Sequence, residues 1–133
     1  MSGEVVSAFG GRSRLDTAFT EALRGVVARV PGARGAVFLD GDGEAVDEFA
    51  EVPTTEIRIL GAHLGILVAL VKENAGKLGE PQELVIEAER ATLLVMVLED
   101  RYLVALEAGP TAQLGVMRRE LGRAADALRR EMR

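Results

Sequence analysis

The fifteen residues from Ile57 to Val71 form the most restrictive feature of this chain, because only Arg58 and His63 among them are polar. The run is shorter than the ~20 apolar residues that span a bilayer, so we expect no membrane insertion. Pro53, Thr54, Thr55 and Glu56 precede it, and this segment can supply a polar cap and an acidic residue in the first turn of a helix. We predict a helix that runs to about Lys77 and that must hide its apolar surface against protein.

One stripe of this helix has the spacing to cover a sheet: Leu60, Leu64, Leu67, Val71, Ala75 and Leu78. Ile59, Ile66 and Leu70 then remain on its flank. An exposed apolar patch on a small protein indicates an interaction surface.

Small residues lie beside that patch, at Gly61, Gly65, Ala69 and Gly76. A glycine inside a helix costs ~1 kcal/mol relative to alanine, which suggests compensation by packing. We predict a helix-to-helix contact between subunits, most simply in a two-fold homodimer. The alternative is that these residues accommodate the chain's own sheet or a loop.

The rest of the chain has alternating helix and strand patterns. A helix with apolar residues from Leu15 to Val30 is predicted to begin at a capping box of Ser13 and Asp16 and to end at Pro31-Gly32. Two strands, Gly35–Asp40 and Ala45–Val52, flank an Asp-Gly turn and predict a hairpin.

Three further strands are predicted at Glu83–Ala88, Ala91–Leu98 and Tyr102–Ala108. The second of them is apolar on both faces and is expected at the centre of the sheet. Thr111 can cap a last helix whose stripe is Leu114, Met117, Leu121, Ala124, Leu128 and Met132. The predicted order is α-β-β-α-β-β-β-α.

The predicted fold is an α/β sandwich with a five-stranded antiparallel sheet, one helix on one face and two on the other. The chain's 133 residues suit a single domain. We expect residues 1–12 to form a flexible lead and residues 13–133 to form the domain.

The residue types of ordinary catalysis are nearly missing. The chain has no cysteine, no tryptophan and one histidine, His63. The acidic run from Asp40 resembles a calcium loop, but Ala45 stands where an EF-hand needs glycine. The adjacent acids Asp47 and Glu48 point to opposite faces of an extended strand and make a poor acid–base pair. We predict no enzyme activity, no catalytic residues, no cofactor and no metal.

Charge and cysteine usage bear on partners and location. The net charge of −5 opposes nucleic-acid binding. The absence of cysteine suits a reducing cytoplasm, which is the expected location. The acidic hairpin and the arginine-rich last helix are interpreted as solvated faces with roles left open.

The chain resembles the Roadblock/LC7 family, which includes bacterial MglB-type small GTPase regulators and adaptors. The resemblance is carried by VPGARGAVFLDGDGEAV (Val30–Val46), the middle helix, LVIEAERATLLVMVLEDRYLVALEA (Leu84–Ala108) and GVMRRELGRAADAL (Gly115–Leu128). It implies a profilin-like sandwich that forms a homodimer, in which the middle helices lie side by side and the third strand extends the sheet across the dimer.

The resemblance also implies a non-enzymatic platform that binds a Ras-like small GTPase or another roadblock-family protein in bacterial cell polarity or motility control. The platform would map to Arg58, Ala62, His63, Ile66 and Leu70. Together with the residues above, the predicted dimer or partner interface comprises Arg58, Ile59, Gly61, Ala62, His63, Gly65, Ile66, Ala69, Leu70, Gly76 and Val85.

Two functional expectations remain open. Some GTPase-activating relatives carry a C-terminal extension, and the sequence ends at Arg133, so an adaptor or scaffold is expected before an activator. The alternative is a small-ligand-sensing domain. Its pocket would need polar groups inside the sandwich, and the strands offer Thr92 and Tyr102.

Overall fold

Five strands form one antiparallel sheet in the order β2-β1-β5-β4-β3. They are β1 (Ala33–Leu39), β2 (Ala45–Ala50), β3 (Glu83–Glu87), β4 (Thr92–Val97) and β5 (Leu103–Ala108). The computed structural model describes residues 17–51, 54–99 and 102–132. The predicted lead and the predicted capping box at Ser13 and Asp16 lie outside the described residues.

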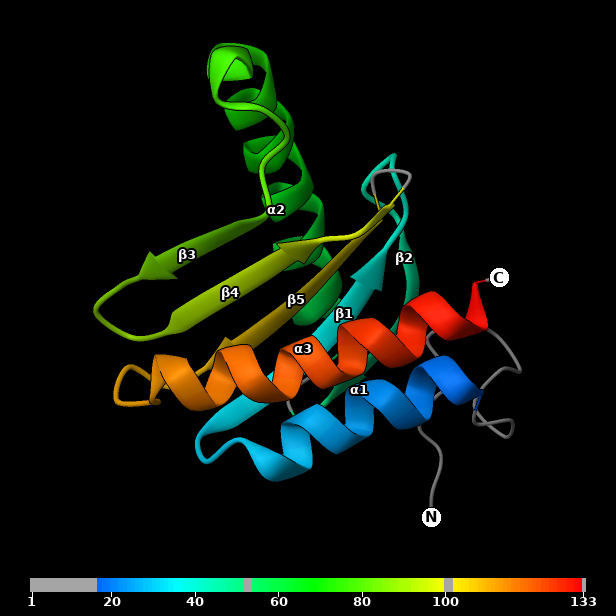
Figure 1. Ribbon diagram of the computed structural model, residues 1–133. Helices are drawn as coiled ribbons and strands as arrows, with labels where there is room; N and C mark the ends of the chain where they lie inside the picture. Colours follow the sequence, from blue (N-terminus) through cyan, green and yellow to red (C-terminus); the bar gives the residue numbers. More distant parts are fainter. Residues whose placement is uncertain (1–16, 52–53, 100–101, 133) are drawn as a thin grey trace.

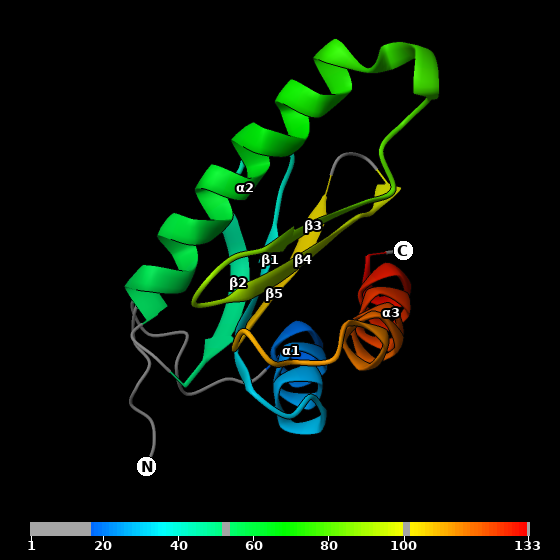
Figure 2. The same cartoon turned by 90° about the vertical axis from the view of Figure 1, so that its left-hand side faces the viewer.

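Three helices cover the two faces of this sheet. The helices α1 (Ala18–Arg29) and α3 (Leu114–Glu131) lie side by side on one face (Figure 1). The helix α2 (Thr54–Asn74) lies on the opposite face (Figure 2) and is followed by the short 3-10 helix η3 (Gly76–Leu78). The predicted α/β sandwich, with two helices on one face and one on the other, is confirmed.

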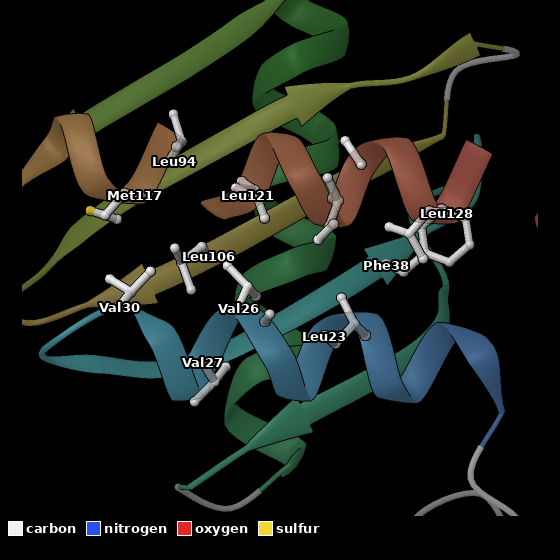
Figure 3. Close-up of a cluster of buried hydrophobic side chains, with 14 of the residues drawn as sticks. Leu23, Val26, Val27, Val30, Phe38, Leu94, Leu106, Met117, Leu121 and Leu128 are labelled. Atoms are coloured by element: carbon white, nitrogen blue, oxygen red, sulfur yellow. The ribbon is translucent and has the colours of Figure 1, made fainter. Parts of the chain in front are cut away.

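The larger core lies between the sheet and the α1–α3 pair (Figure 3). Leu23 and Val26 of α1 and Leu121 of α3 are fully or almost fully buried there, as their helical spacing predicts. Phe38 of β1 lies in the same core, with Phe19 and Tyr102 rings 5.2 Å and 5.4 Å from its own. This face of the sheet is therefore closed within one chain.

The described start of α1 is tied to β2 by side-chain hydrogen bonds. Thr17 caps the helix: its hydroxyl oxygen accepts from the Thr20 backbone N–H, and the Thr20 hydroxyl accepts from the Thr17 backbone N–H. Both hydroxyls donate to Asp47 Oδ2, at 3.0 Å from Thr17 and 2.5 Å from Thr20. The buried Asp47 thus fixes the helix on the sheet.

The hairpin between β1 and β2 has the predicted Asp-Gly chemistry. Asp40 Oδ1 accepts from the backbone N–H groups of Asp42 and Glu44, at 2.9 Å and 3.1 Å. Gly43 has a φ of +82°, a conformation that side chains disfavour. The acidic residues at the start of this run therefore shape a turn.

Two local predictions are wrong. The central strand is β5, which is buried along most of its length, whereas β4 lies second from the edge. The N-cap of α3 is Gln113, which makes no side-chain capping bond, and not Thr111. The apolar pattern located both elements. It did not determine which strands lie beside β4, and it did not determine where α3 begins.

Candidate functional site

The buried row of α2 consists of Ile57, Gly61, Leu64 and Val68, which face β1 and its neighbours. The predicted sheet-facing stripe is therefore only partly right. Leu64 is buried and Leu60 is half-buried, but Leu67 and Val71 are each 40% exposed and Leu78 is 87% exposed. The observed row is rotated about the helix axis by about 50° from the predicted stripe, which is half of the ~100° between successive residues.

The position of α2 on the sheet explains this exposure. The helix packs mainly against β1 and β2, and its C-terminal part projects beyond the end of the sheet (Figures 1 and 2). Leu67 and Val71 belong to that later part. They lack the sheet surface that Leu64 has beneath it.

The same placement leaves part of the sheet without full cover. Four side chains of β3 and β4 point to the α2 side of the sheet, pack against the second core and are only half-buried: Leu84, Ile86, Leu93 and Val97. We call them the uncovered sheet face. The sequence did not predict this surface, since the alternation of Leu84, Val85 and Ile86 indicates two faces but not which one a helix leaves open.

The exposed apolar residues of α2 form a broad surface beside that sheet face. Ile59, Ile66 and Leu70 are 54%, 59% and 48% exposed, and Leu67 and Val71 continue the surface around the helix. We call these five residues the α2 apolar face. His63 is exposed between them, and Ala62 and Ala69 are exposed on the adjoining flank of the helix. The prediction that Ile59, Ile66 and Leu70 stay uncovered within one chain is confirmed.

Two glycines of the predicted interface have contacts within the chain. A β-carbon on Gly61 would stand 2.9 Å from Leu39 Cδ2 and 3.2 Å from Val37 Cγ1, so Gly61 faces the sheet. A β-carbon on Gly65 would stand 3.4 Å from Gly43 Cα in the hairpin turn. The placement of Gly61 at a subunit contact is therefore corrected, because only glycine lets α2 lie this close to β1.

Gly76 and Val85 lie away from the α2 apolar face. Gly76 is exposed on η3, and a β-carbon there would meet no described atom within 4 Å. Val85 is half-buried on β3 and packs against the core on the α1–α3 side. Its side chain is thus directed to the face opposite α2, although β3 itself is an edge strand.

Arg58 and His63 are the polar side chains of the predicted platform. Arg58 is half-buried, and its Nε lies 4.0 Å from Oε1 of the buried Glu48. Glu48 therefore points toward α2, whereas its neighbour Asp47 binds the threonines of α1. The two adjacent carboxylates lie on opposite sides of β2, as alternation predicts.

Metal sites, membrane spans and ligand pockets each place requirements on the described residues. Within residues 17–51, 54–99 and 102–132, no group of three His, Cys, Asp or Glu residues has the arrangement of a metal site. No helix in these ranges is long and apolar enough to cross a membrane. The polar candidates for a ligand pocket are a buried Thr92 and a Tyr102 that stacks on Phe38.

Solved structures share this architecture over most of the chain. The gliding protein MglB from Thermus thermophilus is 25% identical, with a TM-score of 0.75 over 97% of this chain and 96% of that one. A structure described as MglB with tetrameric arrangement is 26% identical, with a TM-score of 0.75 over 98% and 96% of the two chains. A Roadblock/LC7 domain from Streptomyces avermitilis has 23% identity and a TM-score of 0.75, over 84% and 95%.

The sequence agrees with this structural likeness. No curated protein matches the chain significantly. The family model of the Roadblock/LC7 domain, however, matches residues 20–115, which run from α1 through the whole sheet to the first turn of α3. The chain belongs to the Roadblock/LC7 domain family.

Proposed function

We propose that this protein is a non-enzymatic, dimeric roadblock adaptor that binds a Ras-like small GTPase, another roadblock-family protein, or both, in the control of bacterial cell polarity or motility. The observation that carries the proposal is the α2 apolar face beside the uncovered sheet face. Exposed apolar side chains that gather in one place on a small protein mark a surface for protein contact.

The first occupant of this surface is a second copy of the chain. Leu67 and Val71 follow Leu60 at helical spacing, and Leu60 packs against the same core as the uncovered sheet face. A two-fold axis beside this flank would place the second α2 against the first and above Leu84 and Ile86. Each interface residue would then contribute to the contact once from each subunit.

The energy of this contact is of the right order for a dimer. Burial of a half-exposed Leu, Ile or Val side chain contributes about 1 kcal/mol, and each such residue counts once in each subunit. Leu67 and Val71 are such residues, and the four half-buried residues of the uncovered sheet face add smaller amounts. The summed burial energy from both subunits is comparable with the about 4–15 kcal/mol that association costs in lost translational and rotational freedom.

The edge strand β3 supports the same arrangement. It pairs with β4 on one side and, among the described residues, with no strand on the other. An open strand edge offers backbone N–H and C=O groups for pairing with another chain. Antiparallel pairing of two β3 strands would continue the sheet from one subunit into the next.

The outer surface of α2 is the proposed platform for the GTPase or the second roadblock protein. Ile59, Ile66 and Leu70 supply apolar contact area, and Arg58 and His63 supply polar contacts at its margin. This composition fits binding, and it lacks the paired acid and base that hydrolytic chemistry requires. The named function of the gliding protein MglB supports a role in motility, and the tetrameric MglB structure supports self-association in this family.

The test is capture of partners from the native cytosol with GDP or a non-hydrolysable GTP analogue present. The bait is the full chain, compared with Ile66→Glu and with Leu78→Glu as a matched control outside the α2 apolar face. We expect a Ras-like GTPase or a roadblock protein, identified by mass spectrometry, to bind wild type and Leu78→Glu but not Ile66→Glu.

The captured material, tested further, separates the proposed adaptor from the alternatives. A purified GTPase whose hydrolysis rate rises on addition of this protein would replace the adaptor with an activator. A co-purified small metabolite without either protein partner would favour the small-ligand-sensing domain. Equal capture by Ile66→Glu and wild type would contradict the proposed platform.

A further inference from the structure

A groove of about 920 Å³ lies at the end of the sheet, where the C-terminal part of α2 projects past it. Its walls come from separate parts of the chain: the β1–β2 turn at 40–43, one flank of α2, the segment 80–82 and the end of β4 at 97–99. Figure 1 shows the projecting end of α2 and the β1–β2 turn at the same end of the sheet. The groove borders both buried cores, since Leu98 of the larger core and Val68 and Leu103 of the smaller one are among its lining residues.

The floor of the groove is apolar, and most of its side chains are small. Ala62, Gly65 and Ala69 line it from α2, and Val97 and Leu103 line it from the sheet. Ala62 and Ala69 are exposed, so their small side chains leave the helix backbone open to close approach. The floor therefore fits another protein segment that lays apolar side chains along the helix.

The rim of the groove has an excess of acidic residues. Lys72 and Arg129 are its cations, and its acids are Asp40, Asp42, Glu73, Glu80 and Glu99. Both cations are already paired within the chain: Lys72 Nζ lies 3.0 Å from Glu80 Oε1, and Arg129 Nε lies 2.7 Å from Glu99 Oε1.

The negative potential at the rim therefore faces outward. Asp42 and Glu73 are exposed and form no ion pair among the described residues. The carbonyl end of α2 lies at the same place and adds the negative end of the helix dipole. An anionic ligand such as a nucleotide or an acidic lipid would be repelled here.

We propose that this groove is a docking site for a basic amphipathic segment of a partner protein. Its apolar side chains would lie on Ala62, Ala69 and Leu103, and its Lys or Arg side chains would meet Asp42 and Glu73. A peptide fits better than a small molecule, since the groove is open along one side and would leave a compact ligand in contact with water.

The groove shares Val97 with the uncovered sheet face and Ile66 with the α2 apolar face, and its other lining residues belong to neither surface. The groove uses the flank of α2 that carries Ala62, Gly65 and Ala69, whereas the dimer contact uses the flank that carries Leu60, Leu67 and Val71. The two sets lie on different sides of the helix by their spacing. The α2 wall of the groove, at Ala62, Gly65 and Ala69, is therefore not part of the proposed dimer contact.

The test uses a fluorescent peptide with leucine at helical spacing and lysine between the leucines. A matched peptide has glutamate in place of lysine. Binding to the full chain is measured by fluorescence anisotropy at low and high salt. The test variant reverses both rim charges, Asp42→Lys with Glu73→Lys. The control variant, Glu89→Lys with Glu131→Lys, changes the net charge equally at two exposed positions away from the groove.

We expect the lysine peptide to bind wild type and the control variant, and to bind the test variant about tenfold more weakly. Its affinity falls as salt screens the rim, and the glutamate peptide does not bind. Light scattering and circular dichroism should show the same mass and fold for all variants. Absence of lysine-peptide binding, equal loss in the control variant, or equal binding of the glutamate peptide would each overturn the proposal.

Discussion

Gly61 of α2 lies directly against Leu39 of β1: a β-carbon on this glycine would stand 2.9 Å from Leu39 Cδ2 and 3.2 Å from Leu39 Cδ1. Both residues are buried in the smaller core. This contact sets the distance between α2 and the sheet, and with it the surfaces that the helix hides and exposes.

Replacing Gly61 by leucine should therefore lower the free energy of unfolding by about 1–3 kcal/mol, because the larger side chain must push Leu39 or the helix away. Urea denaturation followed by circular dichroism measures the change. The matched control is Gly122→Ala in α3, where a β-carbon meets no atom within 4 Å. Helix propensity should raise its stability by about 0.5–1 kcal/mol. A Gly61→Leu protein as stable as wild type would contradict the close packing.

Asp47→Ala should destabilise the protein by about 1–3 kcal/mol. The substitution removes the carboxylate that accepts hydrogen bonds from Thr17 and Thr20, and leaves a small cavity in a buried place. Thermal unfolding measures the change in the free energy of unfolding. Asp42→Ala on the exposed turn is the control and should shift stability by less than about 0.5 kcal/mol. Equal effects of the two substitutions would show that the α1–β2 tie has no energetic role.

Neighbouring residues of β3 should respond differently, because their side chains face different layers. Ile86→Lys places a charge on the uncovered sheet face and should dissociate the proposed dimer while the chain remains folded. Val85→Ala affects the α1–α3 core and should cost about 0.5–1.5 kcal/mol without altering the molar mass. Light scattering and urea denaturation on both variants check this. A dimer that survives Ile86→Lys would exclude this part of the sheet from the contact.

The ion pair between Arg118 of α3 and Glu83 of β3 should contribute only about 0.2–1 kcal/mol to stability. Arg118 Nη2 lies 2.7 Å from Glu83 Oε2, but both side chains are partly exposed, so water and salt screen the attraction. A double-mutant cycle with Arg118→Ala and Glu83→Ala measures the coupling. A coupling above this range that does not fall in salt would mean that the pair is buried in the assembled protein.

The order of helices and strands was predictable from the sequence because each element has its own period. The alternating strands and the single stripes of α1 and α3 led to the observed layers. The position of β5 at the sheet centre was not predictable, because Thr92–Val97 and Leu103–Ala108 are both largely apolar. Strand order depends on pairing between distant segments, which local periodicity does not report.

The candidate site was predicted in part. Exposed apolar residues such as Ile59 and Ile66 followed from the excess of apolar surface on α2. The row of α2 that faces the sheet was predicted wrongly. Because α2 is apolar on almost all sides, its hydrophobic periodicity does not determine how the helix is rotated about its own axis. Gly61 could have indicated the rotation, since a glycine in a long helix also marks a close approach to the chain's own sheet.

The central claim is that the Leu67 and Val71 flank of α2 and the uncovered sheet face are covered by a second copy of this chain. The most direct measurement is the molar mass of the full chain at micromolar concentration by light scattering, with Leu67→Glu as the interface variant. We predict twice the chain mass of 14.2 kDa for wild type and 14.2 kDa for the folded variant. A wild-type mass of 14.2 kDa would contradict the claim.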